Sequence, residues 1–247
     1  MRKITINLAA VAAFCIVVAS PALVSSSCAT PQTEQEDTTI IREDLGITAL
    51  KYSSPEVPAS IEFCGKTIDL SRFDRHERMD RELLAFTYMH STSLQMLKKA
   101  NRYFPIVEPI LKENGIPDDF KYLMVIESNM NPTARSSAGA AGLWQFMQGT
   151  GRDYGLEVNN NVDERYHIEK ATRAACRYLK DAYAKYKDWV AVAASYNAGQ
   201  ARIASQLAKQ DVDDSLDLQL VEETARYVYR ILAAKQLFSA PTTFGFR

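Results

Sequence analysis

One carboxylate in this sequence stands out because of the residues around it. Glu127 follows an apolar run, Tyr122 to Ile126, and no Asp or Glu occurs from Ser128 through Arg152. Desolvation raises the pKa of a carboxylic acid at the mouth of an apolar site, so the acid keeps a proton that it can donate to a leaving oxygen. Taken alone, a helix-terminal glutamate more often caps a neighbouring backbone. Glycosidases that use two carboxylates need both beside the scissile bond, and the local sequence offers one.

The residues after Glu127 strengthen the chemical interpretation. Ser136, Ser137, Gly139 and Gly142 predict a loop of small residues, which lets a bulky polymer approach the backbone closely. Residues 143–147 (Leu-Trp-Gln-Phe-Met) are predicted to open a new helix that brings aromatic rings and an amide to the same place. Sugar sites combine such apolar platforms with a few fixed polar groups, although the two aromatic residues are equally consistent with core packing.

Two later clusters carry hydroxyl and amide groups next to helix ends. Residues 194–199 read Ala-Ser-Tyr-Asn-Ala-Gly and contain Tyr196 and Asn197, and residues 222–228 contain Tyr227. Each cluster is weak evidence by itself, because a tyrosine at a helix end is usually a core residue with a satisfied hydroxyl.

The elements that must position these residues are predicted to be helices, so the fold class is mainly α. Residues 60–70 alternate partly and predict a short hairpin or extended arm, and no repeat or long strand is present. Helices are predicted at residues 77–100, from Pro105 to Gly115, from a cap at Asp118 or Asp119 to Glu127, and at residues 168–186, 189–197 and 216–238.

The first 27 residues are typical of an export signal. Arg2 and Lys3 precede an apolar core whose unbroken part, residues 8–19, is too short to span a bilayer comfortably, which disfavours the alternative of a transmembrane anchor. Small residues before Cys28 resemble a relaxed lipobox and predict lipidation at Cys28, although simple secretion with cleavage nearby is the alternative. We expect residues 28–56 to form a flexible tether, residues 57–74 an N-terminal arm, and residues 75–247 the catalytic domain.

The remaining cysteines and the histidines predict no metal site. Cys64 and Cys176 are either joined by a disulfide, which an oxidising compartment permits, or are two separate thiols. His76, His90 and His167 are scattered and are expected to be surface or cap residues, so no metal or other cofactor is predicted.

Composition limits the possible partners. The chain has 247 residues, of which 47% are hydrophobic and 24% charged, as in an ordinary globular protein. Its net charge of −1 gives no indication of nucleic-acid binding. We expect a monomer that contacts the membrane only through the lipid anchor, on the outer membrane in the bacterial periplasm.

Three segments in register resemble one enzyme family. Glu127-Ser128, residues 139–147 and residues 194–199 are similar in order and spacing to the catalytic domain of the soluble lytic transglycosylases, glycoside hydrolase family 23. The likeness is greatest to the membrane-bound lytic murein transglycosylase D group and covers about residues 75 to 238. It extends to Phe104-Pro105, Gly115-Ile116-Pro117, residues 162–165 and residues 171–175.

The resemblance implies a lysozyme-like fold of the goose-type or lytic transglycosylase kind and a substrate, the glycan strands of peptidoglycan. Glu127 would protonate the β-1,4 bond between N-acetylmuramic acid and N-acetylglucosamine, and then take the proton of the C6 hydroxyl as that oxygen attacks C1. The products are 1,6-anhydro-muramic acid ends, formed without water during cell-wall remodelling or turnover. By position, the residues that match the substrate-binding cleft are Ser136, Gln145, Met147, Tyr196 and Asn197, while Tyr227 matches a tyrosine that faces the catalytic glutamate.

Two other interpretations remain open at this stage. A goose-type lysozyme hydrolyses with water and needs a carboxylate soon after the catalytic glutamate, which residues 128–152 do not provide. A non-catalytic glycan-binding protein on the same fold is disfavoured because binding alone does not need an acid.

Overall fold

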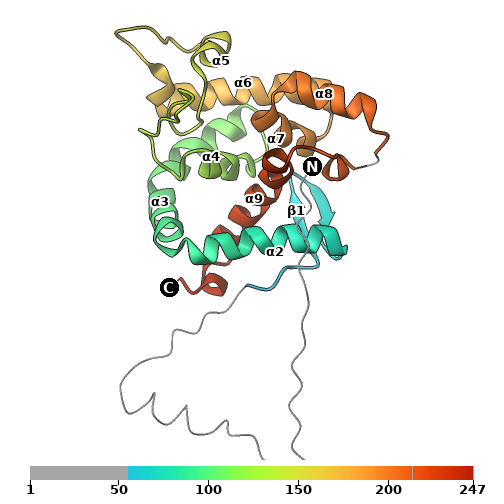
Figure 1. Ribbon diagram of the computed structural model, residues 1–247. Helices are drawn as coiled ribbons and strands as arrows, with labels where there is room; N and C mark the ends of the chain where they lie inside the picture. The colour runs from blue at the N-terminus through green and yellow to red at the C-terminus, as the bar shows by residue number, and fades with distance from the viewer. Residues whose placement is uncertain (1–54, 213, 247) are drawn as a thin grey trace, which may run out of the picture. The chain divides into compact units, whose positions relative to one another are not determined.

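A hairpin is the first regular element that the structure shows. The computed structural model describes residues 55–212 and 214–246 (Figure 1). Strand β1 (Ser60–Phe63) pairs antiparallel with β2 (Lys66–Asp69), which confirms the predicted hairpin. The predicted signal segment, residues 1–27, and the lipidation site Cys28 lie outside the described residues.

All the other regular elements of the described residues are helical. The α-helices are α2 (Phe73–Tyr88), α3 (His90–Glu113), α4 (Phe120–Ser128), α5 (Gln148–Asp153), α6 (Ile168–Tyr186), α7 (Trp189–Ala198), α8 (Gln200–Lys209) and α9 (Glu222–Ser239). Short 3-10 turns lie at η1 (Glu164–Tyr166), η2 (Ser215–Asp217) and η3 (Pro241–Phe244). This architecture confirms the predicted mainly α fold. No helix in residues 55–212 and 214–246 is long and apolar enough to cross a membrane.

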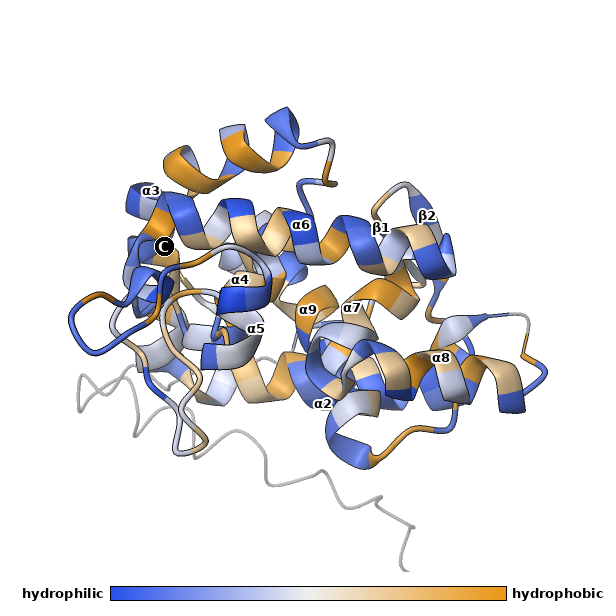
Figure 2. Cartoon of the chain, turned by 90° about the horizontal axis from the view of Figure 1, so that it is seen from above, coloured by the Kyte–Doolittle hydropathy of each residue, from blue (hydrophilic) through white to orange (hydrophobic). Residues whose placement is uncertain are grey.

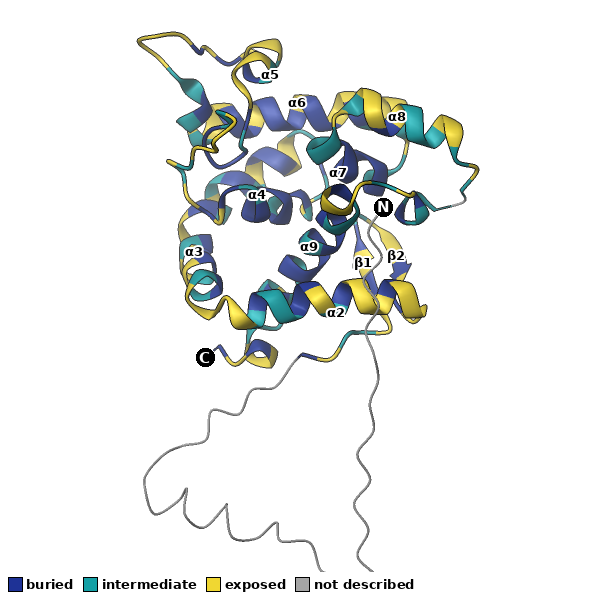
Figure 3. Ribbon diagram, viewed as in Figure 1, coloured by how far each residue is buried: buried dark blue, intermediate teal, exposed yellow. Residues whose placement is uncertain are grey.

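Helix α9 is the centre of the helical unit that the described residues form. It packs against α2, α4 and α7, while α6 packs against α3 and α7 (Figure 1). The apolar helix α7 is buried from Val190 through Ser195, and α4 and α7 show long dark blue stretches in Figure 3. In Figure 2, α7 is mainly orange, whereas α2 and α8 carry blue and orange stripes, as helices with one solvent-facing side do. Burial of these apolar faces therefore places α4 and α7 around α9.

Helix α6 follows the sequence pattern closely. It spans Ile168–Tyr186 as predicted, and Ala171, Ala174, Ala175, Tyr178, Leu179 and Ala182 are buried. His167 is its N-cap residue, and its side chain accepts the backbone N–H of Lys170. Cys176 on this helix and Cys64 in the hairpin turn are both free thiols.

The prediction for the segment before α4 was wrong in two respects. The chain breaks at Met89 into two helices, and Pro105 lies inside α3 together with Pro109, where we had expected it to start a new helix. A proline inside a helix costs one hydrogen bond and about 3 kcal/mol. Burial of apolar α3 side chains along its contact with α6 offsets that cost. The helix closes as expected near Gly115, which has a φ of +66°.

The last helix also starts later than predicted. Residues 216–221 do not belong to α9, which begins at Glu222. Instead, the Asp214 carboxylate accepts the backbone N–H of Leu216 and shapes the 3-10 turn η2. Asp214 and Asp217 both pair with the buried Arg75 of α2, so ion pairs hold this segment outside the helix.

Glu82 on α2 gives a stability prediction. Its carboxylate is 2% exposed and accepts both Nε (2.6 Å) and Nη2 (3.2 Å) of Arg226 on α9. Replacing Arg226 by methionine leaves this carboxylate short of its main partner, so we expect a loss of about 2 kcal/mol in the free energy of unfolding by urea. Arg173→Met, which breaks an exposed pair with Glu113, is the control and should cost less than about 1 kcal/mol. Equal losses in the two variants would contradict the prediction.

Candidate active site

Glu127 lies at the end of a short buried helix. Helix α4 is apolar from Tyr122 through Ile126, so packing against α3 and α9 fixes it in the core. The chain leaves the helix through Asn129 and Met130, both in left-handed conformations with φ of 48° and 59°. This sharp exit leaves Glu127, a half-buried residue, in the last turn of α4.

A tyrosine from the last helix holds the Glu127 carboxyl group. The hydroxyl of Tyr227 on α9, itself 3% exposed, donates a hydrogen bond to Oε1 of Glu127. Burial raises the pKa of Glu127 to about 7, although the hydrogen bond from Tyr227 acts in the opposite direction. Burial and the charge on Glu127 likewise raise the pKa of Tyr227 well above its usual value, so Tyr227 remains a donor. The result is an acid that is protonated in about half of the molecules near neutral pH, as general acid catalysis requires.

Two charged residues of α9 adjust this pKa in opposite directions. Arg230 lowers the pKa of Glu127, and the exposed Glu223 raises it. Both lie one helical turn from Tyr227, on the face of α9 that meets Glu127. The sequence analysis did not predict a role for Arg230. Its spacing of three residues from Tyr227, which places both on one face of a helix, could have indicated it.

Removing either charge should move the pH dependence of a reaction that uses Glu127 as its acid. Activity that needs protonated Glu127 falls as the pH rises through its pKa. Arg230→Gln raises that pKa, so the alkaline limb of kcat/KM should move to higher pH; Glu223→Gln lowers it, so the limb should move to lower pH. Arg230→Lys keeps the charge and is the control. Shifts of the same sign in both glutamine variants, measured from pH 4 to 9, would contradict this electrostatic interpretation.

The loop after α4 is held by backbone hydrogen bonds and one buried arginine. Residues 143–147 do not open a helix as predicted; they form turns and a bridge, and α5 starts only at Gln148. Arg165, 4% exposed, donates to the carbonyls of Gly139 (2.8 Å) and Phe146 (2.9 Å) and pairs with Asp163. These longer-range contacts, which no local pattern encodes, decide the conformation of the loop.

Gln145 takes a left-handed conformation within this loop, with a φ of 48°. Its Nε2 donates to the carbonyls of Gly142 (2.8 Å) and Ala134 (3.2 Å). Trp144 is fully buried, and its ring N–H donates to Thr172, so for this residue the core-packing alternative is correct. The loop therefore turns the indole inward and fixes the Gln145 amide beside the cleft described next.

A cleft of about 300 Å³ brings four of the predicted residues together. Its lining includes Gln145, Met147, Tyr196 and Asn197, together with Phe146, Thr150, Tyr178, Ala198 and Gly199. Met147 is 45% exposed, which places an apolar side chain where it can meet a ligand. The predicted residues Glu127, Ser136 and Tyr227 are not part of this lining.

Tyr196 connects the cleft to the acid. Its hydroxyl donates to the Trp144 carbonyl (2.8 Å), and its pKa is raised well above the usual value by burial and then by the charge on Glu127. The cleft wall at Tyr196 is thus electrostatically coupled to Glu127. Asn197 accepts a hydrogen bond from the buried Thr224 of α9 (2.9 Å), which ties α7 to the helix that carries Tyr227.

Ser136 has a different position from the other predicted residues. It is exposed, and its Oγ accepts the N–H of Ala140 (3.0 Å), so its observed contact shapes the small-residue loop. Across residues 55–212 and 214–246, no group of three or more His, Cys, Asp or Glu side chains is arranged to hold a metal ion.

Comparison with known proteins shows which class of protein this chain is similar to. Residues 105–217 match the model of the transglycosylase SLT domain family. This part of the chain is thus similar to transglycosylase SLT domains, in agreement with the predicted lysozyme-like fold.

Within this class, the chain is similar to the membrane-bound lytic murein transglycosylases, as the sequence resemblance predicted. It is 30% identical to membrane-bound lytic murein transglycosylase D of Escherichia coli over 176 residues, which cover 69% of this chain and 38% of that protein. It is 29% identical to membrane-bound lytic murein transglycosylase C of Haemophilus ducreyi over 55% of this chain and 40% of the relative. An inactive mutant of the lytic transglycosylase Slt from Pseudomonas aeruginosa aligns with a TM-score of 0.48 and 22% identity, over 57% of this chain and 24% of that one. The chain thus spans about two fifths of the length of these two curated relatives.

Proposed function

We propose that this protein is a peptidoglycan lytic transglycosylase, a carbon–oxygen lyase, with Glu127 as its catalytic residue. The observation that carries the proposal is the Glu127 carboxyl group, whose pKa burial raises to about 7 beside a tyrosine donor. The names of the relatives, lytic murein transglycosylases, supply the substrate. Gln145, Met147, Tyr196 and Asn197 bind the glycan along the cleft. Ser136 shapes the small-residue loop, and Tyr227 holds the Glu127 carboxyl group.

In the first step, Glu127 gives its proton to the oxygen that joins N-acetylmuramic acid to N-acetylglucosamine. The bond from C1 to that oxygen breaks, and the acetamide of the substrate stabilises the positive charge at C1. In the second step, the ionised Glu127 takes the proton of the C6 hydroxyl, and the C6 oxygen bonds to C1 to form the 1,6-anhydro ring. One carboxyl group serves as acid and then as base, which suits a pKa near the working pH.

Hydrolysis is the alternative, and it has one specific candidate for the second carboxylate. Glu223 is the one acidic residue of the described ranges whose charge acts on the pKa of Glu127. It is exposed in the first turn of α9, where water surrounds it. A hydrolase that used Glu223 as its base would lose most of its activity in Glu223→Gln, whereas the transglycosylase mechanism predicts only the pH shift described above.

Mass spectrometry of muropeptides released from purified peptidoglycan tests the proposal. Products one water lighter than those of a hydrolase, absent with Glu127→Gln, are expected. Reducing-end products would mean hydrolysis instead. No release by the folded protein from several wall preparations would favour a glycan-binding protein without catalysis.

The site of action is also a proposal. An export signal at residues 1–27 and a lipidated Cys28 would place the protein as a monomer on the outer membrane, facing the periplasm. The names of the relatives, which describe them as membrane-bound, support this location. Labelling with a radioactive fatty acid in cells, with Cys28→Ala as the control, tests the anchor.

A further inference from the structure

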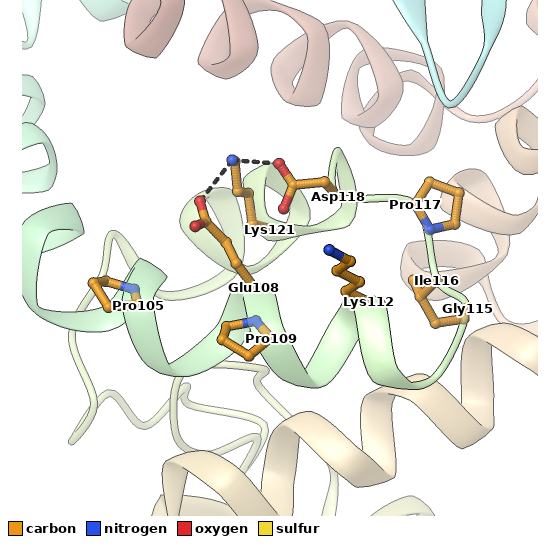
Figure 4. Close-up of a pocket in the computed structure, with 9 residues that line it drawn as sticks. All are labelled: Pro105, Glu108, Pro109, Lys112, Gly115, Ile116, Pro117, Asp118 and Lys121. Carbon is orange, nitrogen blue, oxygen red and sulfur yellow. Dashed lines mark hydrogen bonds and ion pairs between the residues drawn. The ribbon is translucent and has the colours of Figure 1, made fainter.

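A second and larger cleft lies at the opposite end of α4 from Glu127. Its volume is about 900 Å³, and the end of α3, the following turn and the start of α4 form its walls (Figure 4). Lys121 belongs to this lining, and Glu127 lies six residues further along α4, which corresponds to about 9 Å along the helix axis. The two sites are therefore separate, but they share one short rigid helix.

The charges in this cleft are unevenly paired. Lys121 donates to Glu108 (2.7 Å) and to Asp118, and its ammonium also lies 5.1 Å from the centre of the Phe104 ring. One ammonium thus serves two carboxylates, and both carboxylates stay partly exposed, by 40% and 59%. Glu108 and Asp118 therefore each keep an exposed edge that a ligand cation can meet.

Lys112 supplies an unused positive charge in the same cleft. It is exposed and stands four residues after Glu108 on α3, a spacing that commonly forms an ion pair. Glu108 bonds to Lys121 instead, and the Lys112 ammonium has no hydrogen-bond or ion-pair partner among residues 55–212 and 214–246. Figure 4 shows the Lys112 side chain directed toward the side of the cleft where Asp118 and Lys121 lie.

Two proline rings provide an apolar wall. Pro105 and Pro109 both line the cleft from within α3. The Pro109 ring takes the place of the N–H that would otherwise donate to the Pro105 carbonyl, so this wall offers apolar surface to a ligand.

We propose that this cleft binds a short peptide that carries both an ammonium and a carboxylate group. The ligand ammonium lies against Glu108 and Asp118, and its carboxylate pairs with Lys112. The apolar part of the peptide packs against the Pro105 and Pro109 rings. This assignment rests on the proposed function: the natural ligand is the peptide branch of a glycan strand held at Glu127. Four extended residues span about 13 Å, which exceeds the rise of about 9 Å along α4 between Lys121 and Glu127.

Titration of the isotope-labelled full chain with a peptide tests the binding site by NMR. The protein carries Glu127→Gln so that no turnover occurs, and the probe is the tetrapeptide Ala-Glu-Lys-Ala with free termini. Chemical-shift changes are expected at the cleft residues, and Lys112→Met should weaken the affinity about fivefold. Lys98→Met, an exposed lysine on the same helix, is the matched control and should leave the affinity unchanged.

Several outcomes would overturn the proposal. These are equal affinity in the two lysine variants, shifts outside the cleft, or undiminished binding of a probe whose ammonium groups are acetylated. An enzymatic comparison distinguishes the cleft from the active site. On an otherwise active chain, Lys112→Met should lower kcat/KM about fivefold on peptide-bearing murein and leave it unchanged on glycan strands stripped of peptide. Loss of cleavage on both substrates in the unmodified chain would contradict the proposed function, while the NMR titration would still report on the cleft.

Discussion

Glu127→Gln is expected to lower the rate of glycan cleavage about a thousandfold, because glutamine can neither give nor take the proton. The same variant should be more stable than the unmodified protein at pH 8. The pKa of Glu127 rises from 4.5 to about 7 on folding, so its contribution to stability is fully present below pH 4.5 and is lost as the pH rises through 7. Removing the ionisable group avoids that loss, which amounts to at most about 3 kcal/mol. The rate is measured on purified peptidoglycan and the stability by urea denaturation at pH 4 and pH 8.

Equal stability of the two proteins at pH 4 is the internal control for this experiment. Tyr227→Phe is a second control, because it removes the hydrogen bond to Glu127 and leaves the acid in place. A Glu127→Gln protein that is less stable at pH 8 would show that burial does not raise the pKa of Glu127. A variant that retains its rate would remove Glu127 from the chemistry.

Gly142→Ala is expected to destabilise the protein by about 3–5 kcal/mol, or roughly 10 °C in Tm. A Cβ atom at this position would lie 2.0 Å from the backbone carbonyl oxygen of Arg165, which cannot move without disturbing η1. Gly142 also has a φ of 78°, which penalises any side chain. Because this loop carries Gln145, we expect activity to fall together with stability. Thermal denaturation followed by circular dichroism checks the first effect.

Gly139→Ala in the same loop is the matched control. Gly139 also has a positive φ, 90°, but a Cβ atom there would meet nothing within 4 Å. Its replacement should cost only the conformational penalty, about 1–2 kcal/mol. If the two alanine variants lose the same stability, the close approach to Arg165 has no energetic importance.

The sequence predicted well those helices whose buried residues recur at helical spacing along one face. The bounds of α6 were predicted without error because its buried residues recur at helical spacing and His167 caps its start. The predictions failed where distant contacts decide the outcome. Pro105 was expected to open a helix, but the packing of α3 against α6 carries the helix through it. The turn η2 interrupts an apolar pattern because Asp214 and Asp217 pair with Arg75, more than a hundred residues earlier.

In the candidate site, too, local patterns predicted some residues, whereas distant contacts decide the positions of others. The sequence pattern singled out Glu127. The family resemblance pointed to Gln145, Met147, Tyr196 and Asn197, which come from two separate segments and line one cleft. It could not show that residues 143–147 form turns, because the contacts that hold this loop come from Arg165. Arg230 was also missed, since its influence on Glu127 depends on how α9 packs against α4.

The pairing of Tyr227 with Glu127 has a consequence for when the protein becomes active. The two residues are 100 positions apart, and Tyr227 belongs to α9, which lies near the C-terminal end of this chain. A ribosome therefore makes Glu127 before it makes the helix that holds this acid. A nascent or truncated chain that ends before Glu222 therefore has its proton donor but lacks both the hydroxyl that orients it and the helix around which α4 and α7 pack. Under the proposed function, glycan cleavage would therefore begin only after α9 has been made and packed against α4.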